Sequence, residues 1–150
     1  CLVEKAAAEG WSVYLLGAAP GVAENAVEKL RCAYPGLRVA GAHHGYFKEE
    51  EACRVAEAVR QAQPELLFVA LGAPRQEIWI DRYLELTGAT VAMGVGGSFD
   101  VIAGRARRAP GWVQRLHLEW LSRLLMNPSR WKRQLVLPCF ACMVLRKYKL

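Results

Sequence analysis

The sequence lacks any apolar run long enough to cross a bilayer, and it lacks two well-known nucleotide-binding motifs. Its 150 residues contain no stretch of about 20 uncharged apolar residues, which excludes a membrane-spanning helix. Neither GxGxxG nor GxxxxGKS/T occurs, so a standard dinucleotide site or P-loop is not supported. Apolar residues make up 53%, enough to bury a core, which excludes a disordered or low-complexity chain.

The sequence has five cysteines, an odd number, and no complete metal-ligand motif. An odd number of cysteines, in a chain apolar enough to bury a hydrophobic core, argues against a disulfide framework. We therefore expect reduced thiols in a cytoplasm. Cys139 and Cys142 form a CxxC with no second CxxC or His pair nearby, which favours small apolar packing residues over zinc or redox chemistry. His43 and His44 are adjacent, without a carboxylate at ligand spacing, so a loop role is favoured. We predict no metal and no cofactor.

Short apolar strands alternate with amphipathic helices along the first two thirds of the chain. The strands are expected at 11–17, 37–42, 66–72 and 90–97, and the helices at 22–34, 48–62 and 75–86. Parallel neighbours need crossover connections, which such helices provide. The pattern therefore predicts an α/β fold, a parallel sheet flanked by helices on both faces.

The beginning of the sequence is unusual for such a fold. It starts with Cys1 on a helix-forming stretch that stops at Gly10, with no strand before it. We therefore expect this sequence to be a fragment of a longer protein, with part of the active site upstream.

Charge changes sharply near residue 104, where we place a domain boundary. Residues 1–104 carry 9 basic and 13 acidic side chains, whereas 105–150 carry 11 basic residues and one acid, Glu119. The first part, 1–104, is expected to be an incomplete α/β domain, and the second, 105–150, a basic, Trp-rich helical appendage. Its uncharged segment 135–145 lies between cationic clusters, which fits an anionic membrane surface. Docking on its own domain or on a second subunit, and hence a homo-oligomer, fits equally well.

Three loops that leave the expected strands are rich in glycine and proline: 17–21, 72–77 and 94–100. In an open parallel sheet, ligands bind where loops leave the carboxyl ends of strands. Glycine also lets backbone N–H groups approach an anion closely, although all such turns favour glycine. Three at one edge favour a nucleotide or nucleotide-sugar site. The candidate contacts in these loops, besides those discussed next, are Gly17, Gly72, Pro74, Gly96, Gly97, Ser98 and Phe99.

Polar side chains in two of these loops suggest specific contacts. Arg75 offers a forked donor for phosphate, and Gln76 can both donate to and accept from sugar hydroxyls. Glu77 is favoured as a residue that stabilises the N-terminus of a helix. Asp100 is either a polar ligand contact or the N-cap of the turn that follows, and the sequence leaves both open.

The basic region places arginines on nearly one side of its expected helices, roughly Trp112–Met126 and Ser129–Leu137. Arg123, Arg130 and Arg133 are spaced by 7 and 3 residues, and Arg108 and Arg115 continue the trend upstream. Three tryptophans lie among them: Trp112, Trp120 and Trp131. A nucleic-acid surface, a solvated helix face and a diphosphate site beside a membrane all fit this pattern. The neighbouring apolar segment argues against nucleic acid.

Three stretches together resemble the WecG/TagA/CpsF family of bacterial glycosyltransferases: GAPRQE, GVGGSFDVIAGRARRAP and LEWLSRLLMNPSRWKRQ. The resemblance covers nearly the whole chain. It implies a Rossmann-like domain with a C-terminal appendage, acting without a metal on the inner membrane face as a peripheral protein. Such enzymes move an N-acetylmannosamine-type sugar from a UDP donor to polyprenyl-diphosphate-linked N-acetylglucosamine, with inversion, for teichoic acid or related polymers.

The resemblance also implies roles for individual residues. Gln76 would contact the donor sugar, Arg108 would belong to the substrate site, and Arg123, Arg130 and Arg133 would hold the departing diphosphate. The general base expected for the family is an Asp upstream of this sequence, so the fragment alone is expected to be poorly active. A non-catalytic nucleotide-binding module and a basic nucleic-acid binder are the alternatives.

Overall fold

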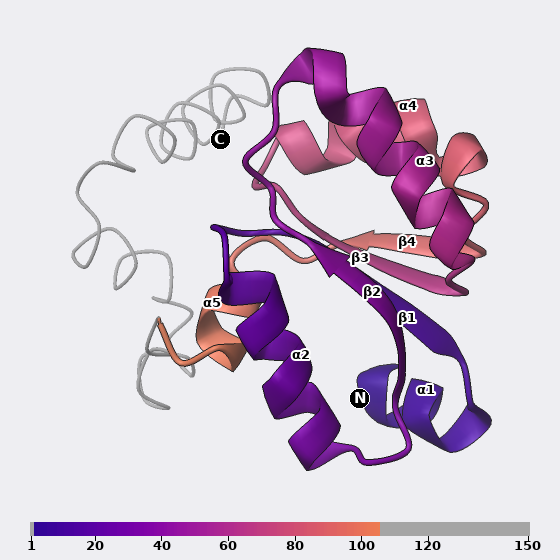
Figure 1. Cartoon of the computed structure of the whole chain (residues 1–150), viewed down its shortest axis with the longest axis vertical. Helices are drawn as coiled ribbons and strands as arrows, with labels where there is room; N and C mark the ends of the chain where they lie inside the picture. Colours follow the sequence, from indigo (N-terminus) through magenta and orange to yellow (C-terminus); the bar gives the residue numbers. More distant parts are fainter. Residues whose placement is uncertain (1, 106–150) are drawn as a thin grey trace, which may run out of the picture. The chain divides into compact units, whose positions relative to one another are not determined.

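The computed structural model describes residues 2–105, which form a parallel sheet between two layers of helices (Figure 1). The strands are β1 (Ser12–Gly17), β2 (Arg38–His43), β3 (Leu66–Ala70) and β4 (Val91–Gly94). They are arranged in the order β2-β1-β3-β4, and every neighbouring pair is parallel. The predicted α/β fold is therefore confirmed, whereas the predicted helical appendage lies outside the described residues.

The helices divide between the two faces of the sheet. They are α1 (Leu2–Glu9), α2 (Val22–Ala33), α3 (Ala52–Ala62), α4 (Arg75–Thr87) and α5 (Ser98–Ile102), with a 3-10 turn, η1 (Glu49–Glu51), before α3. Helices α1, α2 and α5 contribute side chains to the core on one face, and α3 and α4 to the core on the other (Figure 1).

The two central strands are buried along their whole length. In β1, Val13 and Leu15 pack with α1 and α2, while Tyr14 and Leu16 pack with α3. A parallel strand covered on both faces needs apolar residues at every position, which is why its sequence is a continuous apolar run rather than an alternating pattern.

The edge strand β4 is only half covered. Val91 is 45% exposed and Met93 is 43% exposed, although their partners on β3, Leu66 and Phe68, are buried. Ala92, which points the other way, packs against the core beneath α3 and α4. No helix among residues 2–105 combines the length and hydropathy that a bilayer span requires.

Three details differ from the sequence-based expectation. Strand β2 includes His43, which was expected in a loop, because its pairing with Leu16 of β1 continues to that residue. The helix expected over 48–62 begins instead with η1, where the Lys48 N–H donates to the Glu51 carboxylate over 2.7 Å. The short helix α5 begins at Ser98, whereas only a turn over 101–104 was expected.

The connections reverse direction at the centre of the sheet. From β1 the chain passes through α2 to β2 at one edge, then through α3 on the other face to β3. The carboxyl ends of β1 and β3 are therefore neighbours whose loops leave toward opposite faces. This switch point is where open α/β sheets bind ligands.

At the opposite end of the same two strands, a carboxylate links the start of β1 to the start of β3. The backbone N–H of Ser12 and its hydroxyl both donate to Glu65, the hydroxyl over 2.5 Å. The Glu65 N–H donates in return to the Ser12 hydroxyl over 3.1 Å. These hydrogen bonds hold the pKa of Glu65 below its ordinary value.

We predict that Glu65→Gln lowers the melting temperature at pH 7 and that this difference narrows in acid. A carboxyl whose pKa is lowered on folding stabilises the folded chain above its unfolded pKa, and this contribution is lost as pH falls through the folded value. Calorimetry from pH 7 down to about pH 3 tests this. Glu57→Gln, at an exposed position of α3, is the control. A melting difference that is equally large in acid would contradict the prediction.

Candidate functional site

The loops after β1 and β3 are locked together at the switch point. Gly17 has φ +133°, and a Cβ placed there would lie 2.5 Å from the carbonyl carbon and oxygen of Ala70. The next residue, Ala18, donates its N–H to the Ala70 oxygen over 2.9 Å. Ala18 itself has φ 60°, a left-handed conformation that costs a residue with a side chain free energy. Position 17 therefore requires glycine.

Residues 43–47, the last residue of β2 and the loop that follows it, pack onto this junction and are called loop 43–47. The Gly45 N–H donates to the Ala18 oxygen over 2.8 Å. Gly45 is buried, and a Cβ there would lie 2.8 Å from Leu71 Cδ2 and 3.1 Å from Gly17 Cα. Three loops from three strands thus meet around two glycines, which leave the backbones room to touch.

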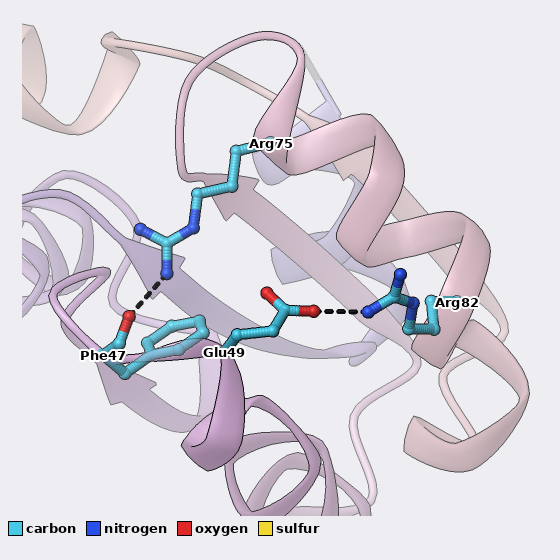
Figure 2. Close-up of polar contacts among 4 residues, drawn as sticks. All are labelled: Phe47, Glu49, Arg75 and Arg82. Carbon is cyan, nitrogen blue, oxygen red and sulfur yellow. Dashed lines mark hydrogen bonds and ion pairs between the residues drawn. The ribbon is translucent and has the colours of Figure 1, made fainter.

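Arg75, the first residue of α4, holds the same loop from the other side (Figure 2). Its Nη1 donates to the Gly45 oxygen over 3.2 Å, and its Nη2 donates to the Phe47 oxygen over 2.7 Å. The guanidinium carbon lies 4.8 Å from the centre of the Phe47 ring, a cation–π contact. The Arg75 guanidinium was expected to bind phosphate, but in the structure two of its nitrogens donate to backbone carbonyls instead.

Gln76 connects α4 to the loop after β4. It is 7% exposed, and its carboxamide lies against Gly94, where a Cβ would approach Nε2 to 2.7 Å. The Gly96 N–H donates to Gln76 Oε1 over 3.1 Å, and Gln76 Nε2 donates to Glu77 Oε1 over 2.8 Å. The side chain predicted to contact the donor sugar thus positions the backbone of the glycine-rich loop.

The rest of this loop turns directly into α5. The Val95 N–H donates to the Val69 oxygen over 2.8 Å, and the Ser98 hydroxyl donates to the Val95 oxygen over 2.7 Å. Gly97 is the residue that caps α5, so the interpretation of Asp100 as an N-cap is wrong. Asp100 lies inside the helix, half-exposed, and its role as a ligand contact stays a prediction. Phe99 is 2% exposed, so its side chain belongs to the core.

The remaining predicted residues fall into two groups. Gly72 accepts the Gln76 N–H over 3.0 Å, and Pro74, which follows a cis peptide bond, caps α4. Glu77 lies in the first turn of α4, as expected for a residue that stabilises a helix N-terminus. The predicted site residues that lie outside the described residues are Arg108, Arg123, Arg130 and Arg133.

The sequence did not identify loop 43–47 as part of the site. Beside it lies a hollow of about 300 Å³. The side chains that line it are His43, His44, Tyr46, Phe47, Glu51, Arg54, Val55 and Ala58. Tyr46 is 71% exposed at its rim. The signal that could have identified this loop was HHGYF, in which a glycine lies between two pairs of aromatic residues at the end of a strand.

The two histidines of this loop contact each other and the backbone. His43 Nδ1 lies 2.7 Å from the His44 oxygen, so this nitrogen carries a proton and donates. His44 Nδ1 accepts the Tyr46 N–H over 3.3 Å. Within residues 2–105, no group of three or more His, Cys, Asp or Glu gathers as a metal site would require. The predicted loop role of His44 agrees with these contacts.

This edge, with glycine loops closed around a switch point, occurs in a chain whose sequence matches a known family. Residues 1–150 match the family described as glycosyl transferase WecG/TagA/CpsF. The chain belongs to this family. It is 43% identical over 137 residues to an N-acetylglucosaminyldiphosphoundecaprenol N-acetyl-beta-D-mannosaminyltransferase of Bacillus subtilis, covering 91% of this chain and 53% of that protein.

A second relative has the same name. The protein from Bacillus spizizenii is 41% identical over 145 residues, covering 97% of this chain and 56% of that protein. The chain therefore spans about half the length of these curated relatives.

We predict that Gly17→Ala destabilises the chain much more than Gly21→Ala. Both glycines have positive φ, which costs alanine about 1–3 kcal/mol, but only at Gly17 would a Cβ meet neighbouring backbone, 2.5 Å from Ala70 C and O. Overpacking adds about 1–3 kcal/mol at Gly17, whereas nothing lies within 4 Å of a Cβ at Gly21. Urea unfolding of both variants measures the difference. Equal losses of unfolding free energy in the two variants would show that the backbone at Ala70 moves away from the new Cβ without cost.

Proposed function

We propose that this chain forms the UDP-sugar side of an inverting glycosyltransferase. The enzyme moves an N-acetylmannosamine-type sugar from UDP to polyprenyl-diphosphate-linked N-acetylglucosamine for a bacterial surface polymer. Relatives that carry this activity in their names, at 43% and 41% identity, support the proposal. The observation that carries it is the set of glycine-lined loops joined at the switch point, in a chain of this family.

The donor diphosphate would lie at the carboxyl edge of the sheet. Helices α2 and α4 both begin there, and their N-terminal dipole ends favour an anion. Gly21 and Gly72 carry no side chains that would keep a phosphate from the backbone, and nothing lies within 4 Å of a Cβ at Gly21. Gln76 holds Gly96 in place and has one amide hydrogen beyond its bond to Glu77 for a sugar hydroxyl.

In the reaction, a hydroxyl oxygen of the acceptor sugar attacks the anomeric carbon of the donor as the bond from that carbon to UDP breaks. A base removes the hydroxyl proton, and we assign this role to an Asp upstream of the present sequence. The leaving UDP gains negative charge, which Arg123, Arg130 and Arg133 would neutralise. The proposal includes no metal and no cofactor.

We predict that Arg123→Ala slows sugar transfer far more than it weakens UDP binding. The charge that this residue would meet appears mainly in the transition state, and loss of one such donor costs about 100-fold in rate. The test compares single-turnover rates and UDP dissociation constants in a protein extended upstream to the length of its relatives. Arg60→Ala, in the last turn of α3 far from the carboxyl edge, is the control. Equal losses of rate and binding would indicate simple binding.

The alternatives give different outcomes in the same assays. UDP binding without sugar transfer, even by the extended protein, would indicate a nucleotide-binding module. Salt-dependent binding to RNA or DNA, without binding to anionic vesicles, would indicate a nucleic-acid binder.

We predict that deletion of residues 134–150 weakens association with anionic vesicles while the sheet stays folded. The deleted part contains the uncharged segment and the cationic cluster after it, which together would supply apolar burial and charge attraction. Vesicle sedimentation measures association, and circular dichroism checks the fold. Unchanged sedimentation would show that residues 134–150 do not bind an anionic membrane surface.

A further inference from the structure

Loop 43–47 is held from two sides at one residue. Gly45 donates its N–H to the Ala18 oxygen over 2.8 Å and accepts Nη1 of Arg75 at its own oxygen over 3.2 Å. Ala18 in turn donates to Ala70 over 2.9 Å. A continuous chain of hydrogen bonds therefore runs from the start of α4 through loop 43–47 to loop 17–21 and β3.

The Arg75 side chain holds loop 43–47 at two backbone carbonyls at once. Its planar group donates to the Phe47 oxygen (Figure 2) and lies over the Phe47 ring. It also donates to the Gly45 oxygen, two residues earlier. Hydrogen bonds from a charged donor are the stronger ones, and the fork fixes their direction. Lysine cannot reproduce this arrangement, because its ammonium is a single point without a planar face.

We propose that Arg75 is a positioning residue for the donor site. It holds Gly45 against Ala18, and through Ala18 it fixes the backbone of loop 17–21, rather than binding the diphosphate itself. The inference rests on the proposed function, because it assigns loop 17–21 to the UDP site. It replaces the direct phosphate contact that the sequence suggested for this arginine.

A second contact links α4 to the chain just after loop 43–47, and it provides a matched control. Arg82 forms an ion pair with Glu49 of η1, and both side chains are exposed (Figure 2). This pair joins α4 to η1, and among residues 2–105 it forms no hydrogen bond with Gly45, Phe47 or loop 17–21. Exposed ion pairs contribute little, so its loss should leave the junction intact.

The experiment compares Arg75→Gln, Arg75→Lys and Arg82→Gln with the unmodified chain. Hydrogen–deuterium exchange is followed in peptides that cover 43–48 and 17–21, and UDP affinity is measured by calorimetry at low and high salt. We expect both Arg75 variants to exchange faster in both peptides. We also expect them to bind UDP about tenfold more weakly, because the charge-assisted hydrogen bonds that hold the loops in place are lost. The salt dependence should not change, because no phosphate contact is lost. Arg82→Gln should match the unmodified chain.

A kinetic measurement separates positioning from a general loss of structure. In the extended protein, Arg75→Gln should raise KM for the donor about tenfold with a small change in kcat, measured at a temperature where the variant is still fully folded. A variant that is merely less folded would lower kcat in proportion to the unfolded fraction.

Several results would overturn the inference. Unchanged exchange in either peptide would show that Arg75 does not hold the loops, and unchanged UDP affinity with faster exchange would show that they do not shape the donor site. Full affinity in Arg75→Lys, or a weaker salt dependence in Arg75→Gln, would indicate direct phosphate binding. If the unmodified chain and the extended protein both fail to bind UDP, the proposed function fails, and the exchange data still decide whether Arg75 holds loop 17–21.

Discussion

The close approach of Gly17 to Ala70 is the constraint around which this edge of the sheet is built. It brings the ends of β1 and β3 together so tightly that a Cβ would touch the neighbouring backbone at 2.5 Å. The loops from β1, β2 and β3 can hydrogen-bond to one another because this junction is closed. The candidate site is therefore preorganised by backbone contacts, and side chains such as Arg75 and Gln76 secure the loops around it.

The secondary structure of this chain was largely readable from its sequence. The two central strands are continuous apolar runs, since both of their faces are covered, and α2 and α3 show apolar residues at helical spacing. The order of the strands was not readable, because apolar patterning determines which face is buried but not which strand lies alongside. Helix α5 was missed because its five residues give too short a pattern to detect.

The arrangement of the loops was predicted from the sequence, whereas most contacts of their side chains were not. The glycine-rich loops do meet at one edge, as the strand ends required. The partners of Arg75 could not be found from the sequence, since Gly45 and Phe47 lie 30 and 28 residues away along the chain. Gln76 was selected for its amide chemistry, but its neighbour Gly96 depends on the packing of α4 beside β4. The roles of Arg108, Arg123, Arg130 and Arg133 stay predictions.

The left-handed backbone of Ala18 has a consequence for any attempt to stabilise this protein. Glycine at position 18 would remove the torsional penalty of φ 60° and yet give the unfolded chain more freedom to lose. It would also loosen a peptide unit that both donates to Ala70 and accepts from Gly45. A thermostability screen that favoured this change would therefore select against the rigidity of the loop after β1.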